Sequence, residues 1–351
     1  MAYTTIDNGE EHFKTILYTG DGSADNDITG VGFAPDWVWA KNRGAADAHW
    51  VLDSTRGATK GLYTNGTAAE NTQNHLISFD SDGFSVGNQA NGLNTSSNNY
   101  VAWNWKANGG TTSSNTDGTI TSTVQANTTA GFSIVTYTGT GSNATVGHGL
   151  GKVPAMIITK TRDNADNWGV YHQGVDSTAP EDYYLPLNLT NARIDVSSTW
   201  NDTAPTSSVF SVGSNGVSND SGGMVAYCFS EVKGYSKFGS FHGNSSLDGP
   251  MIYTGFSTKW LMYKNITSAT DWMILDDKRI HNASNAQLDY LEPNTSDSEG
   301  NMKLDFLSNG FKLRESSESG AKFNVTGQKY IYMAFAEHPF VSSKGVPVTA
   351  G

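Results

Sequence analysis

A threefold internal repeat constrains the fold of this chain more than any other feature. Each copy opens with a phenylalanine, passes through an apolar run that ends in a lysine, and closes on a run rich in aromatic residues. The opening residues are Phe13, Phe132 and Phe238, the lysines are Lys41, Lys160 and Lys264, and the closing runs are 100–106, 224–229 and 330–335. Because such a repeat unit usually corresponds to one structural module, we expect three similar modules.

Short strands are the predicted content of each module. The apolar runs are brief and are bounded by Gly, Asn, Asp and Pro, which is typical of strands in a sandwich. Asp82 and Gly83 predict a tight turn with positive φ, after which Phe84 and Val86 alternate onto one face. Only 16% of residues are charged, against about 25% in average domains, which disfavours helices. The predicted fold is all-β, with three tandem β-sandwich modules of jelly-roll or lectin-like type.

The domain boundaries follow from the repeat and from local composition. They are an N-terminal attachment arm at 1–12, sandwich modules at 13–106, 132–235 and 236–340, a linker at 107–131, and a C-terminal tail at 341–351. The linker is rich in Thr, Asn, Ser and Gly, so it is expected to bury little and to hold at most one strand, at 119–124. The arm has acidic residues and no core pattern, so we expect another protein or a neighbouring copy to order it.

Charge and cysteine content exclude several classes of protein. With 22 basic and 34 acidic residues the net charge is −12, and without a basic stripe this argues against nucleic acid as a partner. The single cysteine, Cys228, lies between Tyr227 and Phe229 and is expected to be an inert core thiol. The sequence shows neither a secretory signal nor a membrane-spanning run. We therefore expect synthesis in a cytoplasm and no membrane insertion.

Recurring Lys, Asp and Arg residues form the sharpest candidate site. They are Lys41, Asp53 and Arg56 in the first copy and Lys264, Asp276 and Arg279 in the third, at identical spacing. A hairpin would bring each Lys and Asp onto neighbouring strands as a cross-strand ion pair. The group could bind an anionic sugar or act in acid–base chemistry, but a weak structural salt bridge is favoured. In the second copy His172 replaces the acid, which argues against three equivalent active sites.

Tryptophans offer a second kind of candidate. Most of the nine tryptophans recur at strand positions and are expected to fill the cores of the modules. Trp200 lies in the polar segment 197–203 without a matching apolar strand. It is therefore predicted to be a surface contact for a ligand.

Metal and catalytic signals are weak. Asp21, Asp25 and Asp27 form an oxygen-rich loop that lacks the register of an EF-hand, so a solvated acidic loop is favoured over a calcium site. The carboxylates Glu231 and Glu337 follow closing strands and are read as structural rather than as a glycosidase pair. No metal, no cofactor and no catalytic residue is predicted, and the protein is not expected to be an enzyme.

Several longer sequence segments resemble a known protein family. The segments 1–7, 79–87, 100–106 and 330–337 resemble tandem-repeat virion proteins, similar to tail or tail-fibre proteins, of tailed phages of marine bacteria. The resemblance covers nearly the whole chain and implies a phage structural protein, with no catalytic residues to transfer. Its location on the particle is open between tail and head.

The expected function is therefore that of a tail-fibre or receptor-binding component exposed on the virion surface. A capsid decoration protein of the head-fibre or cement type is the alternative, followed by a glycan-degrading tailspike and a free bacterial adhesin. The expected partners are other virion proteins, reached through the N-terminal arm, and a host surface glycan or protein. A homo-oligomer is expected, with a trimer considered.

Overall fold

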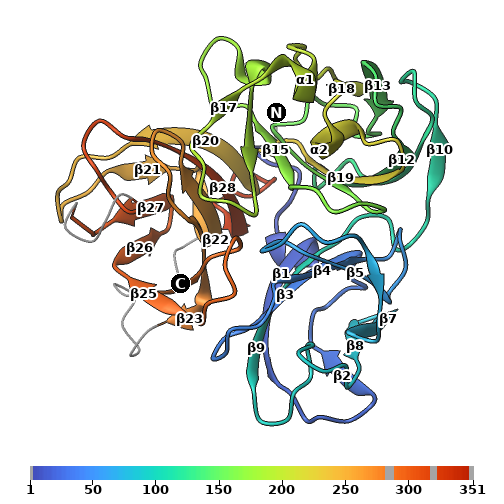
Figure 1. Ribbon diagram of the computed structural model, residues 1–351. Coiled ribbons are helices and arrows are strands. Elements are labelled where there is room, and N and C mark those ends of the chain that lie inside the picture. The colour runs from blue at the N-terminus through green and yellow to red at the C-terminus, as the bar shows by residue number, and fades with distance from the viewer. Residues whose placement is uncertain (1–2, 281–287, 317–321, 348–351) are drawn as a thin grey trace.

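The computed structural model describes residues 3–280, 288–316 and 322–347, and these form three β-rich lobes around a common centre (Figure 1). Helices in the described residues are limited to short turns. They are η1 (Gly9–Glu11), η2 (Pro180–Asp182), α1 (Ser197–Trp200) and α2 (Gly216–Asn219). The predicted all-β fold is confirmed. None of the described helices has the length and apolar content needed to cross a membrane.

The first lobe is a sandwich of two antiparallel sheets. The larger sheet has the order β1 (Phe13–Thr19), β9 (Asn99–Trp105), β3 (Trp37–Asn42), β4 (Trp50–Asp53), β5 (Lys60–Tyr63) and β6 (Asn71–Thr72), and the smaller one has the order β2 (Asn26–Thr29), β8 (Gly83–Val86) and β7 (Leu76–Asp80). Gly83 has φ +154°, and a Cβ there would lie 1.9 Å from the Ile28 carbonyl oxygen, so the predicted turn requires glycine. Phe84 and Val86 are buried between the sheets with Val38.

The second lobe has the largest sheet. Its order is β10 (Ser113–Asn115), β11 (Ser122–Asn127), β12 (Phe132–Thr138), β19 (Gly223–Phe229), β14 (Met156–Thr161), β15 (Gly169–His172), β16 (Tyr183–Pro186) and β17 (Ile194–Asp195), and β13 (Ala144–Gly147) with β18 (Val209–Val212) forms the second layer. The one strand expected in the linker at 119–124 overlaps β11, but β10 is a second strand, and both belong to the sheet of the second lobe rather than to a free linker. Polar residues suffice there because β11 pairs with β12 along its whole length and Gln125 is buried among hydrogen-bond partners.

The third lobe returns to the arrangement of the first. Its larger sheet has the order β20 (Ser236–His242), β28 (Lys329–Pro339), β22 (Phe256–Asn265), β23 (Trp272–Ile280), β24 (Leu288–Leu291) and β25 (Gly300–Met302), and its smaller one has the order β21 (Met251–Tyr253), β27 (Gly310–Leu313) and β26 (Leu304–Leu307). Three apolar clusters, one in each lobe, lie between the two layers.

The large sheets of the three lobes share one strand register. In each, the residue four positions before the repeat lysine pairs both with a residue of the closing strand and with the residue twelve positions after that lysine. The paired sets are Trp37 with Trp105 and Asp53, Met156 with Phe229 and His172, and Trp260 with Phe335 and Asp276. Residues at matching sequence spacing therefore occupy matching places in the three lobes.

A fourth apolar cluster, which we call the central core, joins the lobes. It contains residues from all three large sheets. Trp37 stacks on Tyr227 at 4.6 Å between ring centroids, Phe13 stacks on Phe335 at 5.2 Å, and Trp105 meets Trp260 at 5.5 Å. The repeat predicts modules that each bury their own core, but the large sheets also bury their second faces against one another.

The N-terminal segment packs on the third lobe of the same chain. Ile6 is 3% exposed within the central core, the Tyr3 hydroxyl donates to the Gly255 carbonyl, and Gly9 lies against the backbone of β28. The expectation that a partner mainly orders this arm is therefore wrong for residues 3–12. The predicted C-terminal tail begins with a short bridge between Val341 and Pro347, and its residues 348–351 lie outside the described part.

Candidate functional site

The predicted Lys–Asp pairs do not form. Because the β3–β4 register places Asp53 opposite Trp37, Lys41 lies at the other end of its strand. Its Nζ donates instead to the carbonyl oxygens of Asn42 and Ala45, both at 2.7 Å. Lys264 likewise donates to the carbonyls of Thr270 at 2.6 Å and Thr190 at 3.0 Å.

These lysines are buried, and among the described residues their Nζ atoms donate to carbonyl and hydroxyl oxygens rather than to a carboxylate. Burial lowers the pKa of Lys41 and of Lys160 to about 8, and that of Lys264 to about 7. Each ammonium group binds carbonyls of the loop that follows its own strand. The lysines therefore hold hairpin loops and do not belong to a shared acid–base group.

The Asp–Arg half of each set does form, at the boundary with another lobe. In the first lobe Arg56 pairs with Asp53, and both side chains are fully buried. The Tyr227 hydroxyl of the second lobe donates to the Asp53 carboxylate at 2.7 Å. The same hydroxyl oxygen accepts a hydrogen bond from Arg56 at 3.1 Å. The prediction of a weak Lys–Asp salt bridge is therefore wrong, because the aspartate pairs with Arg56 and this pair is buried between two sheets.

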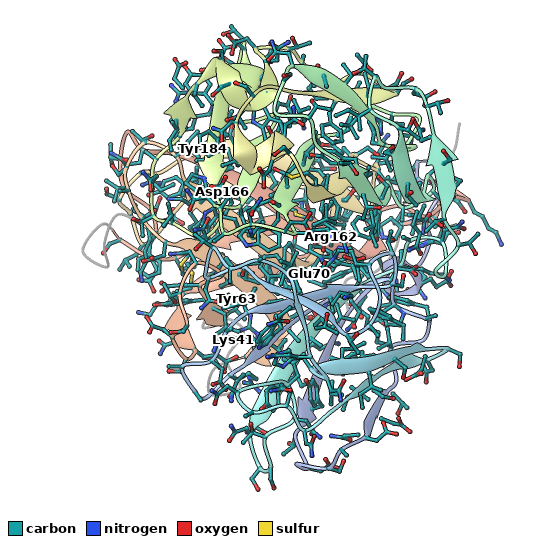
Figure 2. All side chains as sticks on the ribbon, turned by 45° about the vertical axis from the view of Figure 1, so that its right-hand side comes forward. Lys41, Tyr63, Glu70, Arg162, Asp166 and Tyr184 are labelled. Carbon is teal, nitrogen blue, oxygen red and sulfur yellow. The ribbon has the colours of Figure 1, made fainter. Side chains whose placement is uncertain are left out.

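Glu70 extends this cluster to the surface, where it meets Arg162 of the second lobe (Figure 2). Arg56 donates to Glu70 at 2.9 Å, and Arg162 donates to both of its carboxylate oxygens, at 2.9 and 2.8 Å. Burial alone would raise the pKa of Glu70, but the hydrogen bonds from Arg162 and the charge of Arg56 lower it overall. The carboxylate therefore stays ionised between two guanidinium groups.

An equivalent cluster joins the third lobe to the first. Arg279 donates to Asp276 at 2.7 Å and to Glu299 at 3.0 Å. From the first lobe, the Trp103 indole donates to Asp276 at 2.9 Å, and Arg43 donates to Glu299 at 2.8 Å. Arg279 and Asp276 are also fully buried.

A neutral version joins the second lobe to the third. His172 accepts from the Gly174 amide at Nδ1, 2.9 Å, and therefore donates from Nε2 to the Tyr332 carbonyl at 3.0 Å. Burial lowers the pKa of His172 to about 4, which keeps the ring neutral. The second lobe therefore has a neutral hydrogen bond at the place where the other two lobes have the aspartate and the arginine.

Backbone hydrogen bonds complete a closed ring of contacts. Each lobe has a loop residue whose amide donates to a carbonyl of the next lobe. The pairs are Glu70 to Arg162, Arg193 to Ile266, and Glu299 to Arg43, at 2.7, 3.2 and 2.9 Å. The first lobe thus binds the second, the second binds the third, and the third binds the first.

Some members of these clusters could have been found in the sequence and others could not. Arg43 and Arg162 each stand two residues after a repeat lysine, so a Lys-x-Arg recurrence was visible. Glu70 and Glu299 lie 17 and 23 residues after their aspartates, and an ungapped comparison cannot match them.

Trp200 is not a surface contact. It ends the short helix α1, is 2% exposed, and meets Tyr171 edge-on at 6.1 Å between centroids. The helix directs the indole ring into the apolar cluster of the second lobe. Trp200 is therefore buried although it does not lie on an apolar strand. The prediction of a ligand contact at Trp200 is wrong.

The acidic loop of the first lobe makes local bonds. Asp21 accepts from the Ser23 amide and from the Asn94 side chain, and Asp27 accepts from the Ser85 hydroxyl. Among the residues that the structure describes, no group of three or more His, Cys, Asp or Glu side chains is placed to hold a metal ion. Asp21, Asp25 and Asp27 are therefore not gathered around one point.

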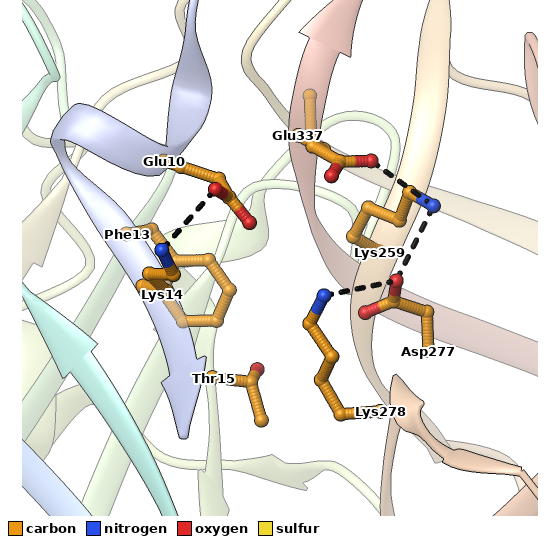
Figure 3. Close-up of a pocket in the computed structure, with 9 residues that line it drawn as sticks. Glu10, Phe13, Lys14, Thr15, Lys259, Asp277, Lys278 and Glu337 are labelled. Carbon is orange, nitrogen blue, oxygen red and sulfur yellow. Dashed lines mark ion pairs between the residues drawn. The ribbon is translucent and has the colours of Figure 1, made fainter. Parts of the chain in front are cut away.

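A small pocket between η1, β1 and the third lobe collects several charges (Figure 3). Lys259 binds Glu337 at 3.0 Å and Asp277 at 3.2 Å, so two carboxylates face one ammonium group. Burial raises the pKa of Asp277; it would also raise that of Glu337, but Lys259 lowers the pKa of Glu337 overall. The cavity measures about 10 Å³, which is room for about one water and not for a sugar ring.

The other carboxylate of the suggested glycosidase pair lies apart from this pocket. Glu231 binds Lys237 at 3.2 Å, whereas Glu337 belongs to the charge cluster around Lys259. Both residues form ion pairs.

Comparison with known proteins assigns the chain to a family. A family model described as a domain of unknown function, DUF7483, matches residues 8–339. The chain belongs to this family. Within the chain the DUF7483 match runs from η1 to the end of β28, so it includes all three large sheets and the junctions between them. The curated proteins contain no match to this DUF7483 member.

Proposed function

We propose that this DUF7483 protein is a structural component of a phage particle, exposed on its surface as a tail-fibre or receptor-binding protein. The observation that carries the proposal is that the Asp–Arg pairs lie buried at the junctions between lobes. The side chains of Asp53, Arg56, Asp276 and Arg279 are fully buried and are saturated by partners from a neighbouring lobe. Groups that a substrate cannot reach hold the protein together and do not turn over a ligand.

The surface chemistry and the resemblance support a place on the particle. Polar loops rich in Asn, Ser, Thr and Gly join strands that are tied into one body, which suits a rigid exposed module. The phrases at 79–87 and 100–106 resemble tail-like virion proteins. A receptor would meet the loops at the outer ends of the lobes.

Imaging of labelled particles tests this location. An affinity tag placed in the exposed turn at 151–152 and decorated with gold or antibody should give density on the tail of intact particles. The absence of label from purified particles would refute the proposal.

Capsid decoration is a second candidate, and the internal symmetry favours it. Three lobes of one register around a central core give a single chain a threefold-like shape, which matches a threefold position on an icosahedral shell. The same images separate the two candidates, since decoration places the label on the head.

A direct assay tests the prediction that the protein is not an enzyme. Incubation with the capsular or cell-wall polysaccharide of the host should release no reducing sugar above the level of a heat-denatured sample. Release that disappears in Asp277→Asn or Glu337→Gln would instead make the protein a tailspike hydrolase.

A further inference from the structure

Each junction between lobes uses the same three backbone positions. One residue donates its amide across the junction to the carbonyl of the residue two places after the repeat lysine. The amide of that second residue donates to the carbonyl of the first residue of the closing strand. The three sets are Glu70, Arg162 and Gly223; Glu299, Arg43 and Asn99; and Arg193, Ile266 and Lys329. Side chains at these positions can therefore be compared directly between junctions.

At two of the junctions the charges at these positions cancel. Arg162 donates to both carboxylate oxygens of Glu70, and Arg43 binds Glu299 at 2.8 Å. A pocket of about 290 Å³ lies at the second of these junctions, but Arg43 and Glu299 in its lining already bind each other. These two junctions therefore offer no free charge to a ligand at the compared positions.

The junction between the second and third lobes carries two cations at the same positions. Arg193 stands where the other junctions have a glutamate, and Ile266 stands where they have an arginine. Lys329 stands where they have the uncharged Gly223 and Asn99. Because the chain as a whole has a net charge of −12, this place differs from the general electrostatic field of the protein.

Arg193 and Lys329 line a pocket at this junction, which we call the basic pocket. The other residues of its lining are Ala192, Ile266 and Thr267. The Arg193 side chain is 36% exposed, so solvent reaches the pocket. Its volume is about 320 Å³, near the lower end of the range of about 300–1,000 Å³ for ligand pockets. The basic pocket therefore has room for one molecule of the size of a sugar unit.

The two cations of the basic pocket lie side by side and have donors to spare. Arg193 binds the Val175 carbonyl at 2.9 Å and the Asp176 carboxylate at 2.8 Å, both through Nη1. Lys329 Nζ lies 3.4 Å from the same Val175 oxygen and forms no ion pair with a carboxylate of the described residues. Among those residues, Nε and Nη2 of Arg193 also make no hydrogen bond. Donors of both side chains are therefore available to a ligand.

Electrostatics at the basic pocket favour an anionic ligand. Burial lowers the pKa of Lys329, and the charge of Arg193 lowers it further, whereas Asp176 raises it and does not restore the usual value. Asp176 is already held by the amide and the hydroxyl of Thr178. An anion between the two cations would offset their repulsion and accept charge-assisted hydrogen bonds from both.

We propose that the basic pocket binds a sugar acid, with its carboxylate between the Arg193 guanidinium and the Lys329 ammonium group. The Thr267 hydroxyl accepts from the Lys329 amide at 2.9 Å and can donate its own hydrogen to a sugar oxygen. A small inorganic anion would fill only part of the volume. The choice of a sugar rests on the proposed function, since an exposed receptor-binding protein meets the acidic polysaccharides of a cell surface.

Ligand-observed NMR with the full chain tests the pocket. Sodium glucuronate is the probe, and a ligand of about 13 non-hydrogen atoms at ordinary efficiency has a dissociation constant of about 1 mM. Glucose has a similar ring without the carboxylate, and acetate has the carboxylate without the ring. Each should bind at least about fivefold more weakly than glucuronate. No binding of glucuronate at about 20 mM, or equal binding of glucose, overturns the proposal; equal binding of acetate would leave a general anion site and no sugar site.

Three variants locate the bound probe. Lys329→Gln should weaken glucuronate binding at least about fivefold, and Lys329→Arg, which keeps the charge, should bind within about threefold of the wild type. Lys237→Gln removes the same charge from an exposed ion pair and should leave binding unchanged. Thermal melting of each variant confirms that it is folded. Wild-type affinity in Lys329→Gln, or an equal loss in Lys237→Gln, would rule out the basic pocket as the site.

The binding result is separate from the location of the protein on the particle. Labelled particles without bound glucuronate would refute the basic pocket alone. Glucuronate binding by a protein that is absent from particles would support the pocket and refute only the proposed function.

Discussion

At the scale of single residues, the repeat has placed ionisable groups where lobes meet. Asp53 and Asp276 each pair with an arginine of their own lobe and accept a hydrogen bond from an aromatic residue of the next. Removal of one member of a buried pair leaves the other charge desolvated and unmatched. These residues should therefore matter more for stability than surface ion pairs do.

Neutralising one buried aspartate should be costly. We expect Asp276→Asn to lower the free energy of unfolding by about 3–5 kcal/mol, because Arg279 would keep its charge without its closest partner. Urea denaturation followed by tryptophan fluorescence measures this. Lys237→Gln, which breaks the exposed pair with Glu231, should change it by at most about 1 kcal/mol; equal losses in the two variants would contradict the assignment.

Lys264 should give stability a pH dependence of unusual sign. Its pKa is about 7 in the fold and about 10.4 in an unfolded chain. Between these values the unfolded state binds more protons, so this lysine makes stability rise with pH from about 7 to about 10. We expect the urea midpoint of the wild type, relative to that of Lys264→Met, to rise across this range. A difference between the two that does not change with pH would refute the shifted pKa.

At the scale of elements, two segments that look like connectors are structural. The segment before β1 contributes Ile6 to the central core, and β11 lies within the sheet of the second lobe. In both segments the neighbouring residues are polar, so the sequence pattern does not predict that the segment is buried. Ile6 fixes the first segment together with the buried Thr4 and Gly9, whereas Gln125 fixes β11, whose backbone pairs with β12.

Truncation of Ile6 tests the role of the N-terminal segment. Ile6→Ala should destabilise the protein by about 2–4 kcal/mol through loss of buried area and the cavity left behind. Leu17→Ala, at a position that is 39% exposed, is the control and should cost less than about 1 kcal/mol. If thermal melting shows no loss for Ile6→Ala, the segment is held elsewhere.

Patterns within short stretches of sequence predicted those features of the fold that depend on neighbouring residues. The turn at Gly83, the burial of Phe84 and the equivalent strands all followed from turn residues, alternation and the repeat. The partners of Asp53 did not, because Tyr227 lies 174 residues away and sequence spacing carries no information on how lobes dock. The prediction for Trp200 was wrong for a related reason. The polar segment forms a four-residue helix, and this helix directs the Trp200 side chain into the protein.

At the scale of the whole molecule, the three lobes should unfold as one unit. The central core and the closed ring of junctions make each lobe part of the interior of the others. We expect calorimetry to show a single transition with a van't Hoff enthalpy close to the calorimetric one. Three separable transitions would mean that the junctions are weak.

Residues 1–106 expressed alone should aggregate or bind hydrophobic dyes, since Trp37 and Trp105 would face solvent.

The ring of junctions also affects how such a protein can diversify. In an assembly of three identical chains, every substitution at an interface is made three times at once. Here each contact is encoded separately, so one junction has His172 where the other two have an aspartate and an arginine. Linking the copies in a single polypeptide thus allows three similar surfaces to acquire three different tasks.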